Sequence, residues 1–340
     1  MRYLRVALFV LGGALLGVLI ARNDPLAILS SITRLSWRLV VVLCFPISVV
    51  TLFDTLGWRF AFLHDRVAFR TLLSARLAGE AFNVTTAAVG GEPVKVWLLR
   101  RQVPLDESVP AVVVAKTTIT IAQGLFLLLG VALAGQTMLS GSPLLRGMLW
   151  LVAVEVVAVA GFVLSQTSGV LGRGERLLGR FGVGGVGRTG ILGRVDEGLV
   201  RFYREEPRRL ALSIAFHFVG WLLGSVEAYL ILRFLGVAVE PTTATVIEAF
   251  GTAVRFATFV IPASLGAAEG GYVVTFAALG LGPAAGMSFG LVRRLREATW
   301  AGIGLVVFAL MRQRNEGPAS VASSVNAAGV ESRTARQRHE

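Results

Sequence analysis

Cysteine and histidine are scarce in this sequence, and their scarcity limits the chemistry it can support. The only cysteine, Cys44, excludes an internal disulfide and a cysteine-based metal cluster. The three histidines, His64, His217 and His339, lie far apart and form no metal-ligand motif. We therefore expect no metal and no cofactor, and we expect Cys44 and His217 to be packing residues.

Charged residues are also few. They make up 16% of the 340 residues, whereas a soluble domain carries about 25%. Hydrophobic residues make up 54%, and the mean hydropathy is +0.70, so the composition indicates an integral membrane protein. The net charge is +12, and the excess of basic residues in a membrane protein usually lies in cytoplasmic loops and near anionic lipids. Because no soluble basic domain is present, we expect no nucleic-acid partner.

A nucleotide-binding motif is absent as well. Residues 166–209 hold nine arginines against five acidic residues and include a glycine-rich run, GRFGVGGVGRTGILGR. This run contains no GxxxxGK[ST] pattern, which excludes a phosphate-binding loop of the Walker type. We interpret residues 166–209 as a basic cytoplasmic loop that rests on anionic lipid headgroups.

Long apolar segments predict an all-α, polytopic membrane protein with about eight membrane segments, of which one or two are re-entrant or broken hairpins. The first apolar segment is expected to be a retained helix, because residues 21–25 form a poor signal-peptide cleavage site. Basic residues near both ends and in the loops predict that both termini are cytoplasmic, at a bacterial inner membrane, with Trp58 at the headgroup level. The membrane domain is expected to cover residues 1–312 and a disordered tail residues 313–340. The predicted full spans are 6–21, 35–56, 109–134, 146–165, 210–235 and 284–311.

Two regions are too polar or too interrupted to be ordinary spans. Residues 76–92 begin and end on the basic side and are too few for two spans of about 20 residues, so a re-entrant pair of half-helices is predicted. Residues 243–281 are broken at Pro262, Gly266 and Gly270, and either two spans or a second re-entrant pair fits. Interrupted segments at corresponding places in two halves are typical of a transporter's midplane site, although chance in a glycine-rich chain stays an alternative.

Ionisable residues inside the predicted membrane region are the candidate site, because such residues are costly and usually functional. Helical spacing places Lys116, Thr120 and Gln123 on one face, Glu248, Thr252 and Arg255 on another, and Arg293 within reach of Glu297. Our hypothesis is that the cations bind a lipid phosphate and that the carboxylates balance them. The alternative is a set of structural ion pairs without a ligand. The candidate substrate-binding residues are Arg76, Glu80, Asn83, Glu92, Lys95, Lys116, Arg255, Glu269, Arg294 and Arg296.

Several of these residues lie in short motifs. The run from Gly79-Glu80 to Gly90-Gly91-Glu92-Pro93-Val94-Lys95-Val96-Trp97-Leu98-Leu99-Arg100 resembles the membrane domain of lysylphosphatidylglycerol synthases. So do Pro262, Leu265-Gly266, Glu269-Gly270 and Arg294-Leu295, and the resemblance extends over about residues 1–312. The family includes stand-alone, flippase-like members, some of them linked to hopanoid pathways.

The resemblance implies movement of a lipid between leaflets. In the two-domain synthases a separate cytoplasmic domain transfers lysine from lysyl-tRNA to phosphatidylglycerol. The sequence leaves no room for that domain after its last helix, so lysine transfer is not expected.

The sequence therefore predicts a lipid translocase that is not an enzyme and uses no nucleotide. Its cargo is expected to be an anionic, aminoacylated or hopanoid-type lipid, and membrane lipids are the expected partners. One alternative is a membrane-embedded lipid-modifying enzyme with Glu80, Glu92 or Glu269 as general base. Another is a non-catalytic scaffold that binds lipid-biosynthesis enzymes through residues 166–209. A homo-oligomer stays open.

Overall fold

The structure, a computed structural model, describes residues 2–23, 25–33, 35–45, 49–64, 67–85, 90–137, 142–167 and 191–316. Within these ranges the regular structure is entirely helical, with thirteen α-helices and one 3-10 turn and no strand. In chain order the elements are α1 (Arg2–Arg22), α2 (Pro25–Thr33), α3 (Arg38–Phe45), α4 (Thr51–Phe60), α5 (Phe69–Thr85), α6 (Gly91–Leu99), α7 (Leu105–Thr137), α8 (Pro143–Thr167), α10 (Ile191–Glu205), α11 (Pro207–Phe234), α12 (Pro241–Ala257), η2 (Pro262–Ser264), α13 (Ala267–Ala278) and α14 (Pro283–Glu316).

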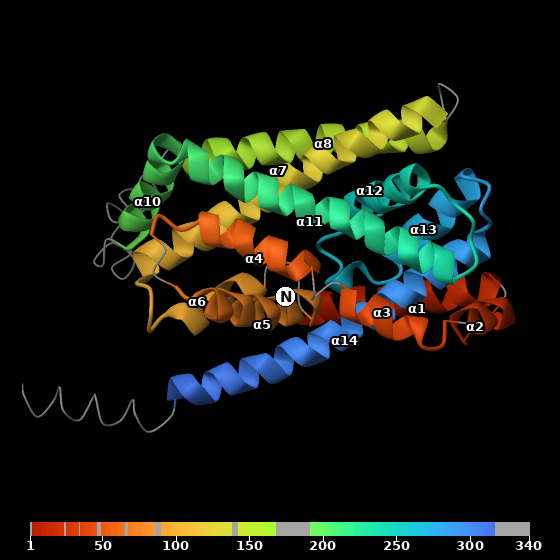
Figure 1. Ribbon diagram of the computed structural model, residues 1–340, viewed down its shortest axis with the longest axis horizontal. Coiled ribbons are helices and arrows are strands. Elements are labelled where there is room, and N and C mark those ends of the chain that lie inside the picture. Colours follow the sequence, from red (N-terminus) through yellow and green to blue (C-terminus); the bar gives the residue numbers. More distant parts are fainter. Residues whose placement is uncertain are drawn as a thin grey trace, which may run out of the picture.

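Three helices, α7, α8 and α11, are long and apolar enough to cross a membrane, with mean hydropathies of 1.9, 2.3 and 1.5. The shortest of them has 25 residues and is therefore about 38 Å long, more than the roughly 30 Å of a bilayer's hydrocarbon core. Helix α7 packs against both α8 and α11, and the three helices run along the long axis of the molecule (Figure 1). The helices predicted over 109–134, 146–165 and 210–235 are confirmed, and α7 and α8 extend past both predicted ends.

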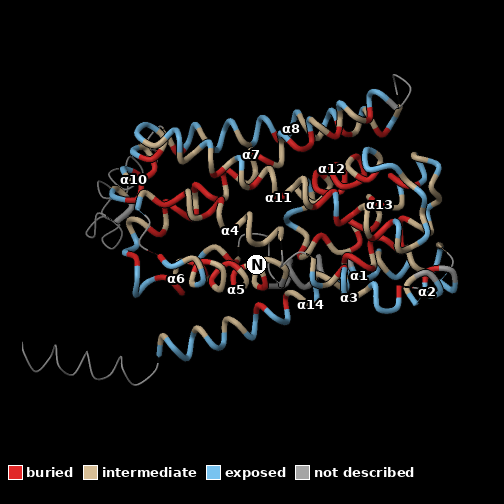
Figure 2. Tube along the Cα trace, in the orientation of Figure 1, coloured by how far each residue is buried: buried red, intermediate tan, exposed pale blue. Residues whose placement is uncertain are grey.

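Helix α8 is the most peripheral of the three. Its large apolar side chains Leu149, Trp150, Val156, Val157 and Leu164 are all at least half exposed. Figure 2 shows the exposed colour along most of this helix. Such a continuous apolar surface is unfavourable in water but suits contact with lipid tails.

The predicted second span, 35–56, is largely covered by α3 and α4. Residues 46–48, between these two helices, lie outside the described residues. Helix α4 then continues to Phe60, so Trp58 belongs to this helix. Its side chain is 1% exposed and packs in an apolar cluster with Phe62, Leu72 and Leu98, so Trp58 is a core residue of the protein.

Residues 166–209, which we interpreted from the sequence as a basic loop, contain the helix α10. In α10, Val195, Leu199 and Phe202 recur at helical spacing and are buried against the ends of neighbouring helices. The Tyr203 hydroxyl donates to Gln166 Oε1 at 2.8 Å, and Gln166 donates to Thr117 Oγ1 at 3.0 Å, which joins α10 to α8 and α7. Residues 168–190 lie outside the described residues.

The two regions predicted to be broken are each divided into short helices. The first consists of α5 and α6, with residues 86–89 outside the described part of the chain. In the second, η2 separates α12 from α13, and three residues here adopt positive φ: Ala263 (53°), Ser264 (48°) and Gly266 (77°). Only glycine adopts positive φ without steric cost, so the surrounding contacts must hold Ala263 and Ser264 in this conformation.

Helix α14 connects the two broken regions. It shows that residues 284–311 are helical, although α14 is not among the three helices apolar enough to be candidate spans, and it packs along α5 on one side and α13 on another (Figure 1). Close approach to α5 requires Gly304, because a Cβ there would lie 2.3 Å from the Leu77 carbonyl oxygen. The last described residue, Glu316, still belongs to α14, so residues 313–316 are helical and not part of a disordered tail.

Candidate functional site

A cavity of about 820 Å³ lies where seven helices, α4, α5, α7, α8, α11, α12 and α14, face one another. Its size is in the upper part of the range of pockets that hold small ligands. Its wall carries five basic and five acidic side chains: Arg76, Lys116, Arg255, Arg293 and Arg296, with Asp54, Glu80, Glu227, Glu248 and Glu297. The remaining wall is largely apolar and includes Leu77, Val84, Val159, Phe162, Phe256, Phe259 and Trp300.

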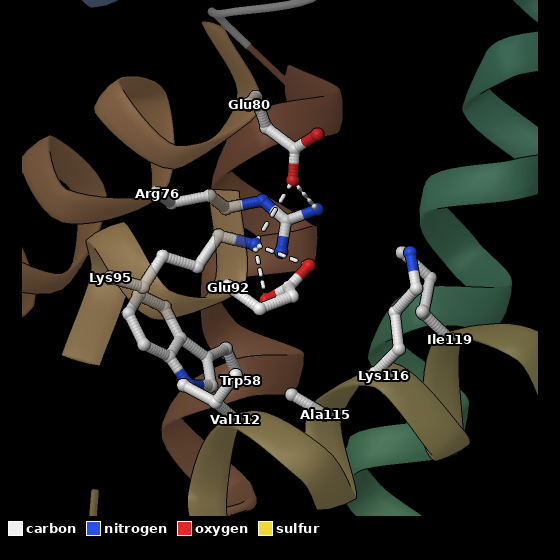
Figure 3. A pocket seen from close by; sticks show the side chains of 9 residues that line it. All are labelled: Trp58, Arg76, Glu80, Glu92, Lys95, Val112, Ala115, Lys116 and Ile119. Carbon is white, nitrogen blue, oxygen red and sulfur yellow. Dashed lines mark hydrogen bonds and ion pairs between the residues drawn. The ribbon is translucent and has the colours of Figure 1, made fainter. Parts of the chain in front are cut away.

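One group of charged residues, the N-terminal cluster, consists of Asp54, Arg76, Glu80, Asn83, Glu92 and Lys95. Arg76 donates to Asp54 at 3.0 Å and lies 3.8 Å from Glu80. Lys95 lies 3.2 Å from Glu80 and 3.1 Å from Glu92, so it links α6 to α5. Figure 3 shows Arg76, Glu80, Glu92 and Lys95 converging, with the ring of Trp58 beside Lys95 and with Lys116 of α7 across from them.

Asn83 holds the broken region 76–92 together. Its Oδ1 accepts the backbone N–H of Gly91 at 2.8 Å, and its amide nitrogen donates to Glu80 and Glu92. Helix α6 starts here because Gly91 allows the two backbones to approach: a Cβ at this position would lie 1.9 Å from the Gly79 carbonyl oxygen. The glycines of the motif therefore have a geometric role.

Asp54 is a member of the cluster that the sequence reasoning missed. One carboxylate oxygen accepts from Arg76, and the other lies 3.0 Å from Nδ1 of His217. His217 thus has a polar partner, which its interpretation as a packing residue did not include. The signal was present in the sequence, because Asp54 was an acidic residue within a predicted apolar span.

The second group, the C-terminal cluster, pairs four arginines with four glutamates. It consists of Glu227, Glu248, Arg255, Glu269, Arg293, Arg294, Arg296 and Glu297. Arg293 is paired with Glu248 through both terminal nitrogens, one of them at 3.0 Å. Arg296 pairs with Glu227, and Arg255 pairs with Glu297. The expected pairing of Arg293 with Glu297 within α14 is therefore wrong, since each residue has its main partner on another helix.

Glu269 has two functions in the fold of this region. One oxygen accepts from Arg294, at 2.6 Å from Nη2 and 2.9 Å from Nε. The other accepts the backbone N–H of Gly266 at 2.8 Å and so caps the start of α13. Arg294 also donates to the Ala263 carbonyl oxygen at 2.9 Å, which fixes the other side of the break.

The ten predicted site residues fall into three groups. Five belong to the N-terminal cluster, four belong to the C-terminal cluster, and Lys116 lies on α7 in the wall that both share. Only half of the ten line the large cavity: Arg76, Glu80, Lys116, Arg255 and Arg296. Glu92 and Lys95 line a small adjoining cavity of about 30 Å³ together with Arg76, Glu80 and Lys116. Asn83, Glu269 and Arg294 line neither and hold the two breaks in shape.

The predicted polar faces meet at the cavity. Lys116, Thr120 and Gln123 all line it, and Gln123 donates to the Thr252 carbonyl oxygen at 3.2 Å. On α11, Gly220 leaves room for Asp54 and Gly224 for Glu248, since a Cβ at either position would lie within 3.3 Å of a carboxylate oxygen. Among the residues with described positions, no group of three His, Cys, Asp or Glu side chains has a metal-binding arrangement.

Comparisons with known proteins agree with the sequence motifs. No curated protein and no solved structure matches the chain. The family model described as the lysylphosphatidylglycerol synthase TM region matches residues 4–306, which include both clusters and the cavity. This family, together with the apolar helices, supports a protein that is embedded in a membrane and has a function related to membrane lipids. The chain therefore belongs to the lysylphosphatidylglycerol synthase TM-region family.

Proposed function

We propose that the protein is a lipid translocase, in which the cavity receives a lipid headgroup while the acyl chains stay in the bilayer. The observation that carries this proposal is a cavity whose wall combines ten charged side chains with a largely apolar remainder. Charges in a membrane interior are costly and are tolerated when they face one another or a hydrated space. An amphiphile matches both parts of such a wall.

The most accessible charged groups suggest which headgroup fits. Within the N-terminal cluster the Glu80 side chain is 46% exposed, whereas that of Arg76 is 8% exposed. Within the C-terminal cluster the Arg255 side chain is 29% exposed, and its guanidinium group can present two donors to phosphate oxygens. A carboxylate and a guanidinium group on the same cavity wall favour a headgroup with a phosphate and an ammonium group, such as an aminoacylated phospholipid.

The proposed topology uses both broken regions as re-entrant elements. Helices α5 and α6, of 17 and 9 residues, and helices α12 and α13, of 17 and 12, are shorter than the roughly 20 residues of a full span. Interrupted backbone at membrane depth is tolerated where it is buried in protein or lines a cavity. With the basic loops inside, the protein has about eight membrane segments and both termini in the cytoplasm of a bacterial cell.

Leaflet exchange in sealed liposomes tests this proposal. Fluorescent phosphatidylglycerol and fluorescent aminoacylated phosphatidylglycerol serve as probes, and a membrane-impermeant quencher reports the outer-leaflet fraction over time. We expect wild-type protein to accelerate exchange of at least one probe, and the double variant Glu80→Gln/Arg255→Gln to lose most of that acceleration.

The matched control is Arg312→Gln/Glu316→Gln, which removes an exposed ion pair of the same type from the end of α14. This control should exchange lipid like the wild type. Exchange no faster than in protein-free liposomes, for either probe, would contradict the proposal. A chemically altered lipid recovered from the same liposomes would instead favour the lipid-modifying enzyme.

A further inference from the structure

Glu155 is a buried acidic residue that neither cluster uses. It lies near the middle of α8 and is 1% exposed, on the same side of this helix as the buried residues Leu144 and Met148. Neither of its carboxylate oxygens has a hydrogen-bond partner among the described residues. A buried polar group without a partner is rare in a folded protein and calls for an explanation.

The carboxyl group of Glu155 faces a glycine of the neighbouring helix. It lies against α7 at Gly124, where a Cβ would be 3.7 Å from the Glu155 carboxyl carbon. The neighbouring polar residue on α7, Gln123, uses its amide group to donate to the Thr252 carbonyl oxygen. The glycine thus provides space for the carboxyl group and supplies no donor to it.

The charged groups on the helices packed against α8 provide no counter-charge for the Glu155 carboxyl group. Helix α7 carries Lys116 about two turns before Gly124, with Asp106 and Glu107 still farther along. On α12, Glu248 and Arg255 are paired with Arg293 and Glu297 of α14. Helix α10, with Arg194, Asp196, Glu197, Arg201, Arg204 and Glu205, packs near the Gln166 end of α8, three turns from Glu155.

An ionised carboxylate in these surroundings would be strongly disfavoured, because burial without a counter-charge penalises the charged form. The neutral carboxylic acid is compatible with them. One carboxyl group without further acidic or histidine ligands does not make a metal site, so the proton is the ligand that this position can hold.

The position is close to the cavity. Ala158, Val159 and Phe162 follow Glu155 on the same face of α8 at helical spacing, and all three line the cavity. Across the helix contact, Thr120 and Gln123 of α7 line it as well. A small shift of α8 along α7 would move the carboxyl group from Gly124 to the wall of the cavity.

We propose that Glu155 is a proton-binding site coupled to this cavity, which deepens the translocase function proposed above and rests on it. In the present conformation the carboxyl group carries its proton. When α8 moves and exposes the group to the cavity, the O–H bond breaks, the proton passes to cavity water, and the carboxylate that remains is hydrated. Lipid exchange then responds to the proton concentration on the side to which the cavity opens.

Infrared spectroscopy of the purified protein tests the proton site without any transport. At neutral pH, the wild type should show the carbonyl stretching band of a protonated carboxylic acid, and Glu155→Gln should lose it. Glu316→Gln, which changes an exposed glutamate on α14, should keep it. A wild-type spectrum without the band, or a band that persists in Glu155→Gln, would overturn the proton site.

Leaflet exchange of the fluorescent phosphatidylglycerols under an imposed pH gradient tests the coupling. We expect the gradient to change the wild-type rate several-fold and to leave the Glu155→Gln rate unchanged, because the amide retains the shape of the neutral acid and cannot release a proton. Equal responses of the two proteins would overturn the coupling. No exchange by the wild type under any gradient would overturn the translocase and with it the coupling, while the infrared band separately decides whether Glu155 holds a proton.

Discussion

The N-terminal and C-terminal clusters both hold charged side chains in the interior of the helical bundle, but they neutralise these charges with different residues. The N-terminal cluster has two cations, Arg76 and Lys95, against three carboxylates, and it completes its network with the neutral amide of Asn83. The C-terminal cluster has four arginines against four glutamates and no neutral member. The first shares its charges among partners, whereas most arginines of the second have a glutamate of their own.

In each cluster, one side chain also accepts a backbone N–H at the interruption between two helices and so stabilises that interruption. In one break Asn83 accepts from Gly91, and in the other Glu269 accepts from Gly266. The N-terminal anchor is neutral and the C-terminal anchor is charged and paired with Arg294. Residues that stabilise the interruptions between helices thus differ from residues that face the cavity. The variants below test this difference in order of decreasing effect.

Arg293→Met should cause the largest loss of stability. Glu248, whose side chain is 2% exposed, would keep its charge without its partner, and breaking a buried pair in this way costs about 3–5 kcal/mol. Thermal unfolding in detergent measures the loss. The double variant Arg293→Met/Glu248→Gln should recover much of it, and equal unfolding temperatures for the single and double variants would contradict the role of the buried charge.

Gly91→Ala should destabilise the N-terminal break. The new Cβ would lie 1.9 Å from the Gly79 carbonyl oxygen, and overpacking of this kind costs about 1–3 kcal/mol or more. Gly302→Ala is the matched control, because no atom lies within 4 Å of a Cβ at that helical position. Thermal unfolding of both variants checks the prediction, which fails if they unfold alike.

Asn83→Ala should have a smaller effect. It removes the acceptor for the Gly91 N–H and two donors to carboxylates, for a loss of about 1–3 kcal/mol. Asn83→Asp should be at least as damaging, because it keeps the acceptor but adds a third negative charge beside Glu80 and Glu92. A stability of Asn83→Asp equal to the wild type would show that the amide donors are dispensable.

Arg255→Gln should affect stability least and lipid exchange strongly. Glu297 would keep Arg294 at 3.1 Å and Arg296 at 3.8 Å, so a change below about 1 kcal/mol is expected. The more exposed position of Arg255 predicts a several-fold loss of exchange in the liposome assay. A variant that loses stability without losing exchange would show that Arg255 stabilises the fold and does not bind the lipid.

Hydropathy and helical spacing were sufficient to predict the long helices and the polar faces. Helices α7, α8 and α11 follow from long apolar runs, and the face with Lys116, Thr120 and Gln123 follows from a period of 3.6 residues. Helix α10 was missed because its apolar positions, 195, 199 and 202, lie within a segment that is otherwise rich in glycine and arginine.

The pairing within the clusters could not be derived from the sequence. Arg293 and Glu248 are 45 residues apart, and Arg296 and Glu227 are 69 apart, so their contact depends on how α14 packs against α11 and α12. Sequence spacing favoured a pair within α14, Arg293 with Glu297, because it detects local neighbours only. Tertiary packing decided the partners instead, and it also brought Asp54 beside Arg76.

The length of α14 has a mechanical consequence. This helix extends 19 residues beyond Glu297, or about 28 Å, and this part packs along α5 and reaches α6. Gly304 lies against the Leu77 carbonyl oxygen of α5, and Asn315 donates to the Leu98 carbonyl oxygen of α6 at 3.2 Å. A rearrangement at the ion pairs of residues 293–297 would therefore be transmitted along α14 to the N-terminal broken region, and a spin label at Arg312 would report it.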